Sequence, residues 1–426
     1  MRTILIAFIS LVGTFAEARA STRPLHLKFD FGPGPVASGC TQVLPKTVYS
    51  KRRGYGFEPG AHISCFDRGG PDDLRRDLCT SDRPFFFSVA LPEGNYRVKI
   101  IFGDAKEATT VKAELRRLML ERVETAPGQF QARELVVNIR TPHIAGDGEV
   151  RLKEREKEIE AWAWDEKLTL EFNGEHPAIA ALEINRADVP TVFLLGDSTV
   201  CDQPLEPYSS WGQMLPRFFG PAIAIANHAE SGESLRSSLA AHRLDKVLSA
   251  MRPGDYLLIQ YGHNDEKEKG GGPFTTYKEA LRLFVERARQ RGGIPVLITP
   301  VHRRTFDATG KIINSHGDYP KAMRQVAREL NVPLIDLNAM SEAFYEALGP
   351  ERSKLAFKEG DNTHHNAYGA YELARAVVEG IRRSGLDLAR HLASDVRPFD
   401  PAHPDPPEAF AIPASPTPPG EKPLGD

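Results

Sequence analysis

The sequence of 426 residues has little net charge, few cysteines and no long apolar run beyond its N-terminal region. Its 54 basic and 57 acidic residues leave a formal net charge of −3, which provides no attraction for nucleic acid or anionic lipid. No later segment reaches the roughly 18 consecutive apolar residues of a membrane helix. With 41% apolar residues, this composition predicts a globular protein that binds neither nucleic acid nor membranes.

Cysteine is scarce, and its spacing excludes the usual zinc motifs. The four cysteines are Cys40, Cys65, Cys79 and Cys201, and none lies in a CxxC or Cys/His pattern. Three fall in the N-terminal part, so at most one disulfide can form there; Cys65–Cys79 is one candidate pair. The sequence alone does not fix the pairing. No metal and no cofactor is predicted.

The N-terminus has the pattern of a secretory signal peptide. Met1-Arg2 precedes an apolar run at Ile4–Phe15, and Ala18-Arg19-Ala20 follows it. A charged start, a short apolar segment and an A-x-A end predict a signal peptide over residues 1–20, cut after Ala20. The mature protein is therefore expected to be secreted or periplasmic, where disulfides are permitted.

The remaining chain is too long for one ordinary domain, and its pattern changes near Asp188-Val189-Pro190. Residues 21–187 contain short runs of β-forming residues between turns, which predicts a smaller β-sandwich or jelly-roll domain. Leu115–Val123 is an exception with a helical pattern. The run KEREKE at Lys153–Glu158 mixes charges of both signs and is typical of a solvated face.

Residues 190–385 alternate apolar strands with amphipathic segments. Continuous apolar strands are typical of a parallel sheet that is covered by helices on both faces, an α/β fold. The expected helices are Ser209–Phe219, Glu233–Met251, Thr275–Arg291, Tyr319–Leu330 and Ala367–Arg383. Residues 386–426 are rich in proline and are expected to form a tail on the surface.

One stretch within this domain, TVFLLGDSTV at Thr191–Val200, indicates a buried strand that runs into a tight turn. The turn would place Ser198 at the carboxyl edge of the sheet, where α/β proteins bind ligands. A serine in this position is also a common helix cap. A dinucleotide-binding fold is excluded because GDSTVC lacks the second and third glycines of that motif.

A base and a group to orient it follow near the end of this domain. Asp361 and His364, in DNTHH, lie three residues apart, so both side chains can lie on one side of a turn. Asp361 can accept the His364 Nδ1–H, which leaves Nε2 free to take the Ser198 proton. The alternative interpretation is a helix N-cap with an exposed histidine.

Donors for an oxyanion come from two other loops. Besides the Ser198 N–H, the candidates are Gly232, on the loop after the second strand, and Asn264, at the end of the third strand. Taken alone, each is an ordinary turn residue. Their positions at the carboxyl ends of strands in one sheet favour a common site.

The order GDS, loop glycine, GxND and DxxH resembles the SGNH (GDSL-type) hydrolase superfamily over residues 190–385. This resemblance implies a flavodoxin-like three-layer α/β/α domain in which Ser198, Gly232, Asn264 and His364 are the four characteristic residues. GDSTV, SGESLRS, QYGHND, TPVHRR, HGDYP and DNTHHNAYGA are similar to the rhamnogalacturonan acetylesterase branch. FDFGPG, GYGFE and LPEGNYRV resemble a galactose-binding-like β-sandwich. Glu233 departs from the pattern, since relatives tend to carry arginine or another residue there.

The resemblance implies a secreted serine carbohydrate esterase that removes acetyl groups from pectin and needs no metal. Candidate contacts to the acidic substrate are His263, His302, Arg303 and Asp318. Three alternatives stay open: an esterase on another acetylated glycan such as xylan, an esterase on a small lipid-type ester, and a non-catalytic glycan-binding protein on a hydrolase scaffold. The oligomeric state is not predicted.

Overall fold

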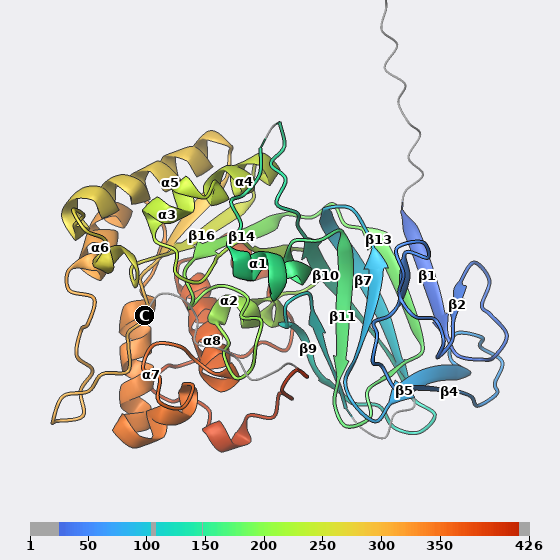
Figure 1. The fold of residues 1–426 in the computed structure, drawn as a ribbon. Coiled ribbons are helices and arrows are strands. Elements are labelled where there is room, and N and C mark those ends of the chain that lie inside the picture. Colours follow the sequence, from blue (N-terminus) through green and yellow to red (C-terminus); the bar gives the residue numbers. More distant parts are fainter. Residues whose placement is uncertain (1–24, 104–107, 147, 417–426) are drawn as a thin grey trace, which may run out of the picture.

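The structure, a computed structural model, describes residues 25–103, 108–146 and 148–416. The predicted signal peptide and the last ten residues of the predicted tail lie outside this range. The described chain forms two units side by side, a β-rich unit and an α/β unit (Figure 1). The β-rich unit and the α/β unit together confirm the predicted fold class. None of the described helices has the length and apolar character to cross a membrane.

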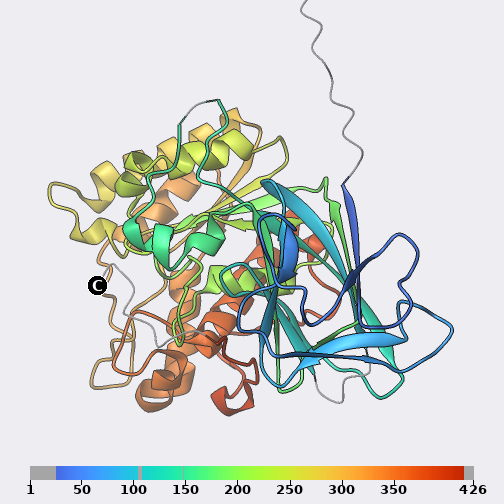
Figure 2. The same cartoon turned by 45° about the vertical axis from the view of Figure 1, so that its right-hand side comes forward.

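The N-terminal unit contains two five-stranded sheets and one three-stranded sheet. Their strand orders are β10-β7-β13-β1-β2, β3-β6-β11-β8-β9 and β12-β5-β4. The strands are β1 (His26–Phe31), β2 (Thr41–Val43), β3 (Tyr55–Phe57), β4 (Ile63–Asp67), β5 (Asp77–Ser81), β6 (Phe85–Ala90), β7 (Gly94–Gly103), β8 (Thr109–Ala113), β9 (Arg117–Val123), β10 (Phe130–Ile139), β11 (Lys167–Asn173), β12 (Ala178–Ile179) and β13 (Ala181–Arg186). Figure 2 shows these strands beside the α/β unit.

The core of this unit comes from alternating residues of facing strands. Tyr96, Val98 and Ile100 of β7 are fully buried and pack in one cluster with Phe87 and Leu170 of the other large sheet. A disulfide joins Cys65 of β4 to Cys79 of β5, the candidate pair named above. The helical prediction for residues 115–123 was wrong, because β9 pairs with β8 in an antiparallel ladder.

The second unit is built on a five-stranded parallel sheet in the order β15-β14-β16-β17-β18. Its strands are β14 (Thr191–Gly196), β15 (Ala224–Asn227), β16 (Tyr256–Gln260), β17 (Ile294–Ile298) and β18 (Leu334–Ile335). Val192 and Leu194 point to one face of the sheet, whereas Phe193 and Leu195 point to the other. Both faces are therefore buried, as the continuous apolar strands predicted.

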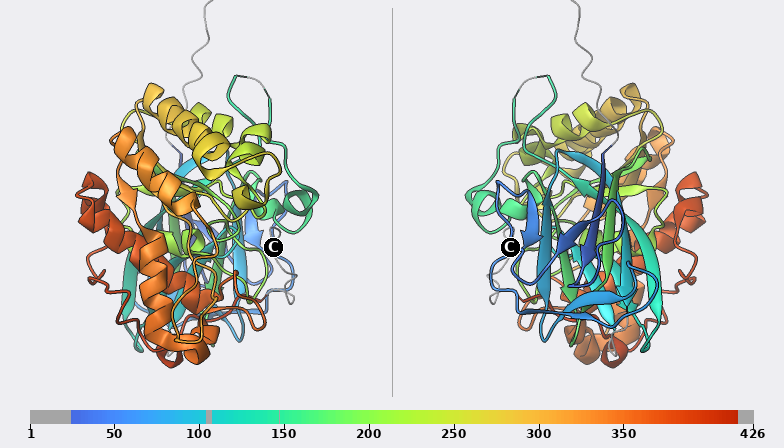
Figure 3. Two further views of the ribbon diagram at one scale, coloured as in Figure 1. Left: turned by 90° about the vertical axis from the view of Figure 1, so that its left-hand side faces the viewer. Right: turned by 90° about the vertical axis from the view of Figure 1, so that its right-hand side faces the viewer.

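Helices cover the two faces of this sheet in separate groups. The first face packs against α2 (Trp211–Met214), α7 (Leu337–Arg352) and α8 (Ala367–Arg383). The second packs against α3 (Leu235–Ala240), α4 (Arg243–Ala250), α5 (Lys278–Gln290) and α6 (Tyr319–Glu329). Figure 3 shows this helical end of the molecule and, in its second view, the opposite β-rich end. The result is the expected three-layer arrangement.

A segment between β10 and β11 reaches from the N-terminal unit to the α/β unit. It includes α1 (Glu154–Glu158), in which Glu156 is fully buried and binds Arg243 of α4 through both carboxylate oxygens at 3.1 and 2.6 Å. The interpretation of Lys153–Glu158 as a solvated face was therefore wrong for Glu156. A second buried pair, Arg117–Asp202 at 2.9 Å, also joins the units.

The described part of the proline-rich tail lies on the surface and contacts both units. Phe410 packs against Tyr368 and Tyr371 of α8, at ring-centroid distances of 5.9 and 5.6 Å. Further along, Lys112 of β8 donates hydrogen bonds to the Pro413 carbonyl and the Ser415 hydroxyl, at 2.7 and 2.8 Å. The tail therefore makes specific polar contacts as well as covering apolar surface.

Candidate active site

The turn after β14 carries Ser198 and is held by its neighbour Asp197. Asp197 is fully buried, and its Oδ1 accepts hydrogen bonds from the Thr199 N–H at 3.0 Å and hydroxyl at 2.8 Å. Its Oδ2 lies 3.2 Å from His263 Nδ1. Burial alone would raise the pKa of Asp197, but His263 and the Thr199 bonds outweigh burial and lower it. An ionised carboxylate thus braces the turn beneath Ser198.

Ser198, His364 and Asp361 form a continuous hydrogen-bonded chain. The Ser198 hydroxyl lies 3.0 Å from His364 Nε2, and His364 Nδ1 lies 2.9 Å from Asp361 Oδ2. Asp361 Oδ1 also accepts the N–H groups of Thr363 and His364, at 2.8 and 3.0 Å. Although burial raises it, the pKa of Asp361 is held far below its usual range by the His364 and backbone bonds. This geometry suits a nucleophile, a base and an orienting carboxylate.

Gly232 and Asn264 lie at the same carboxyl edge of the sheet as Ser198. Gly232 follows β15 and Asn264 follows β16, and both strands pair in parallel with β14. Gly232 has φ of +77°, a left-handed conformation that favours glycine. One Asn264 Nδ2 hydrogen is donated to the Glu233 carbonyl at 3.0 Å. Since an amide carries two hydrogens, the second is available to an oxyanion.

The four predicted substrate contacts have different surroundings. His263 and His302 are 1% and 2% exposed, so neither ring faces solvent in this structure. Arg303 is partly exposed, and its Nη1 lies 2.6 Å from Glu266 Oε1. Asp318 is exposed and precedes the first residue of α6. Substrate contact by these residues stays a prediction, with Arg303 and Asp318 the accessible pair.

Among the described residues, Glu156, Glu160 and Glu230 bring three carboxylate oxygens within 4.8 Å of one another. Guanidinium groups already bind two of these carboxylates: Arg243 binds Glu156 at 2.6 Å, and Arg155 Nε lies 2.5 Å from Glu160. We therefore interpret this cluster as an ion-pair network between the two units.

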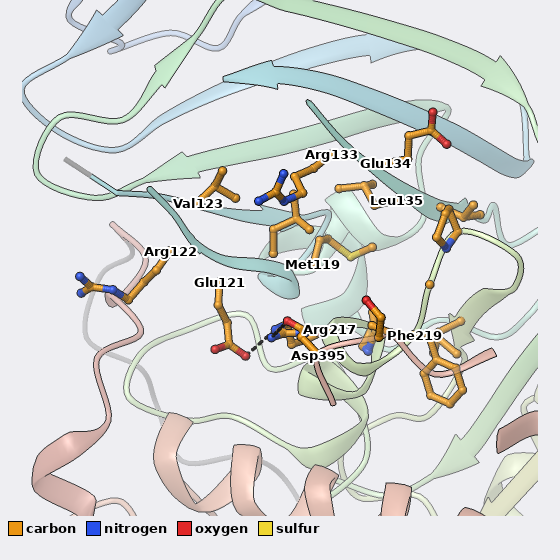
Figure 4. A pocket seen from close by; sticks show the side chains of 18 of the residues that line it. Met119, Glu121, Arg122, Val123, Arg133, Glu134, Leu135, Arg217, Phe219 and Asp395 are labelled. Carbon is orange, nitrogen blue, oxygen red and sulfur yellow. Dashed lines mark hydrogen bonds and ion pairs between the residues drawn. The ribbon is translucent and has the colours of Figure 1, made fainter. Parts of the chain in front are cut away.

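The cavity drawn in Figure 4 lies away from the proposed catalytic residues. It is a groove of about 680 Å³ between β9, β10 and the segment 216–225, and none of Ser198, Asp361 or His364 lines it. Figure 4 shows Arg217 and Glu121 pointing toward each other across it, with Arg217 Nε 2.6 Å from the Glu121 carboxylate. The groove includes Ile223 and Ile225, near the amino end of β15, whereas Ser198 lies at the opposite, carboxyl edge of the sheet.

Comparison with known proteins identifies the family. The GDSL-like Lipase/Acylhydrolase family matches residues 194–371, which contain every member of the Ser198–His364–Asp361 chain. Rhamnogalacturonan acetylesterase RhgT of Bacillus subtilis is 44% identical over 218 residues, which are 48% of this chain and 94% of that protein. The chain belongs to the GDSL-like lipase/acylhydrolase family. The protein is accordingly a carboxylic ester hydrolase.

Two further relatives are similar to this esterase, and one of them matches it over both units. Probable rhamnogalacturonan acetylesterase YesY of Bacillus subtilis is 37% identical over 213 residues, 48% of this chain and 98% of that protein. Uncharacterized esterase YxiM of the same species is 29% identical over 405 residues, 91% of this chain and 98% of that protein. Residues 27–132 match the Beta-agarase/YXIM esterase-like, galactose-binding domain-like family. The predicted N-terminal galactose-binding-like domain is thereby confirmed.

Proposed function

We propose that this carbohydrate acetylesterase is exported and removes acetyl groups from acetylated rhamnogalacturonan in plant cell walls. The hydrogen-bonded chain of Ser198, His364 and Asp361 carries the catalytic part of the proposal. The substrate part rests on RhgT and YesY, whose names give rhamnogalacturonan acetylesterase as their activity. Export rests on the signal-peptide pattern of residues 1–20.

The reaction proceeds by two acyl transfers. His364 Nε2 takes the Ser198 proton while Oγ attacks the acetyl carbonyl, and the resulting oxyanion accepts hydrogen bonds from the N–H groups of Ser198 and Gly232 and from the Asn264 amide. Each such donor typically lowers the barrier by about 3 kcal/mol. Asp361 stabilises the imidazolium that forms. His364 then donates the proton to the departing sugar oxygen, which leaves an acetylated Ser198.

Water completes the cycle. His364 deprotonates a water molecule as it attacks the acetyl carbon of the acyl-enzyme, and the same donors stabilise the second oxyanion. Collapse of this intermediate returns the proton from His364 to Ser198 and releases acetic acid, which ionises to acetate in water. Every proton taken by His364 is given back, so the enzyme leaves the cycle unchanged and no cofactor is required by this scheme.

The experiment is acetate release from acetylated rhamnogalacturonan and from acetylated xylan by wild type, Ser198→Ala and His364→Ala. We expect preferential release from rhamnogalacturonan and a loss of about 10⁴-fold or more in both variants. Ser394→Ala, which changes an exposed serine, is the matched control. Turnover by Ser198→Ala would overturn the mechanism. Release from xylan alone would keep the mechanism and replace the substrate.

Export is tested separately by N-terminal sequencing of the protein recovered outside the cytoplasm. The expected first residue is Ser21, from cleavage after Ala20. Retention of the intact N-terminus in the cytoplasm would overturn this part of the proposal without affecting the catalytic part.

A further inference from the structure

The loop that follows β17 carries two adjacent arginines, Arg303 and Arg304, at the carboxyl edge of the parallel sheet. This loop is anchored to helix α7, because the His302 N–H donates to the Ser341 hydroxyl at 3.0 Å. Both residues of this bond are buried, at 2% and 0% exposed. The two arginines therefore extend from a backbone that packing and hydrogen bonding hold in place.

Arg304 contacts the loop that carries Asp361 and His364. Its backbone N–H donates to the Asn362 carbonyl at 2.7 Å, and its Nη2 donates to the Asn362 side-chain oxygen, also at 2.7 Å. Its Nη1 donates to the Pro350 carbonyl, near the end of α7, at 3.1 Å. Its Nε atom is buried, so the guanidinium lies against the protein. One side chain thus connects the residue next to Asp361 with helix α7.

The two ends of this loop are held differently. At one end His365 is buried, its carbonyl accepts the Ser209 N–H at 2.9 Å, and its Nε2 lies 2.7 Å from the Tyr345 hydroxyl. At the other end Asn362 is exposed. Contacts from a neighbouring loop matter most at such an exposed end, because fewer packed side chains hold it. The bonds from Arg304 are contacts of this kind.

Arg303 contacts a different loop, the one that carries Asn264. Its Nη1 lies 2.6 Å from Glu266 Oε1, and its Nη2 donates to the His263 carbonyl at 3.4 Å. Asn264 lies between these two residues in the chain. Two adjacent arginines of one anchored loop therefore contact both the loop of a proposed oxyanion donor and the loop of the proposed base.

We propose that Arg304 is a positioning residue that holds Asp361 and His364 in line with Ser198, an inference that rests on the proposed serine-esterase function. His364 must reach Ser198 and Asp361 at once, and it does so at 3.0 and 2.9 Å. A displacement of about 1 Å in such an arrangement costs up to about 100-fold in rate. The backbone bond from Arg304 to Asn362 survives replacement of the side chain, so we expect a smaller loss of about tenfold.

The first test is the kinetics of Arg304→Met on p-nitrophenyl acetate and on acetylated rhamnogalacturonan. We expect kcat to fall about tenfold for both esters with little change in KM, because the side chain acts through the base and not on the substrate. Arg304→Lys should recover part of the activity, since it keeps one cationic donor. Arg390→Met, which changes an arginine whose side chain is 82% exposed, is the matched control. A loss confined to the polysaccharide, or a rise in KM alone, would make Arg304 a substrate contact and overturn the proposal.

Asn362 provides a second test of the same contact. Asn362→Leu removes the acceptor of the Nη2 bond and should lose about as much activity as Arg304→Met, whereas Asn362→Asp keeps an acceptor oxygen and should retain most of the activity. If the two residues act through one bond, the double variant should be no slower than either single variant. Losses that multiply to about 100-fold would show that the residues act separately and would overturn the proposal.

Hydrogen–deuterium exchange of the full mature protein separates this proposal from the proposed function, because it requires no turnover. The N–H groups of Thr363 and His364 donate to Asp361, so their exchange reports on the order of the loop. We expect peptides that cover residues 357–366 to exchange faster in Arg304→Met than in wild type and Arg390→Met. Unchanged exchange would overturn the inference, whereas a wild type that hydrolyses neither ester would overturn only the proposed function. Asn362→Leu, at an exposed position, keeps the test decisive if Arg304→Met does not fold.

Discussion

The Lys153 ammonium of the N-terminal unit lies 2.8 Å from the carboxylate of Glu233, the residue next to Gly232. The same ammonium donates to the Ser231 carbonyl on the other side of Gly232. Glu233 is 2% exposed, and its own carbonyl accepts the Asn264 amide at 3.0 Å. The N-terminal unit therefore contacts the loop that carries one proposed oxyanion donor and, through Glu233, the residue that carries another.

Replacing Lys153 with methionine should lower kcat for p-nitrophenyl acetate by about tenfold with a smaller change in KM, because a loosened loop weakens contacts made only in the transition state. Lys153→Arg should restore most of the lost activity, since arginine also carries a positive charge on a long side chain. Steady-state kinetics of the three proteins measures both parameters.

The matched control for this prediction is Lys157→Met in α1, the helix that begins directly after Lys153. Lys157 is largely exposed and pairs with Glu154 at 2.7 Å, which is also on the surface. This variant should behave as wild type, because exposed ion pairs contribute little. An unchanged kcat in Lys153→Met would show that the loop keeps its position without the contact.

Asn264→Ala should reduce kcat by about 100-fold and leave KM nearly unchanged, because one oxyanion donor is removed. Steady-state kinetics with p-nitrophenyl acetate gives both values, and circular dichroism checks the fold. Asn185→Ala in β13 is the control for removing an asparagine away from the site. A change in KM alone would instead place Asn264 in ground-state binding.

Strong local patterns predicted the fold of the α/β unit well, and tertiary contacts explain most of the differences. The apolar run that leads to Ser198 and the three-residue spacing of Asp361 and His364 are local signals, and both appear in the structure as expected. The expected helix 233–251 is split at His242, whose φ of +61° interrupts it between α3 and α4. Helix α7 was not predicted, and residues 117–123 of the expected helix 115–123 form a strand through pairing with β8.

The interface between the units could not be predicted from the sequence. Lys153 and Glu233 are 80 residues apart, and the mixed charges around Lys153 resemble an exposed helix face. The only indication in the sequence was Glu233, an acidic residue at a position where relatives tend to carry arginine or another residue. The burial of Glu156 against Arg243 likewise depends on two units packing together, which no local pattern of either segment encodes.

With Glu114→Gln, the free energy of unfolding should depend less steeply on pH. Burial raises the pKa of Glu114 from 4.5 to about 8, so between these values the folded state holds a proton that the unfolded state has lost. The free energy of unfolding therefore falls as pH rises through this window, by at most about 1.4 kcal/mol per pH unit for one group. Asp265, raised to about 8 as well, adds to the wild-type slope, so the difference between the proteins isolates Glu114.

Urea unfolding at several pH values across this window measures the two slopes. Glu134→Gln, an exposed carboxyl on β10, is the matched control and should keep the wild-type slope. Parallel curves for wild type and Glu114→Gln would show that Glu114 is ionised in the folded protein.

Deleting residues 404–426 should destabilise the protein, because this part of the tail packs on polar and aromatic side chains of both units. The Ser415 hydroxyl donates to Glu171 at 2.8 Å and accepts from Lys112, and both of these partners are buried. Loss of these bonds and of the Phe410 contacts should lower the free energy of unfolding by about 2 kcal/mol or more. Ser415→Ala should cost about 1 kcal/mol, whereas the exposed Ser394→Ala should cost nothing measurable. If urea unfolds the truncated and complete proteins at the same midpoint, the tail lies on the surface without contributing to stability.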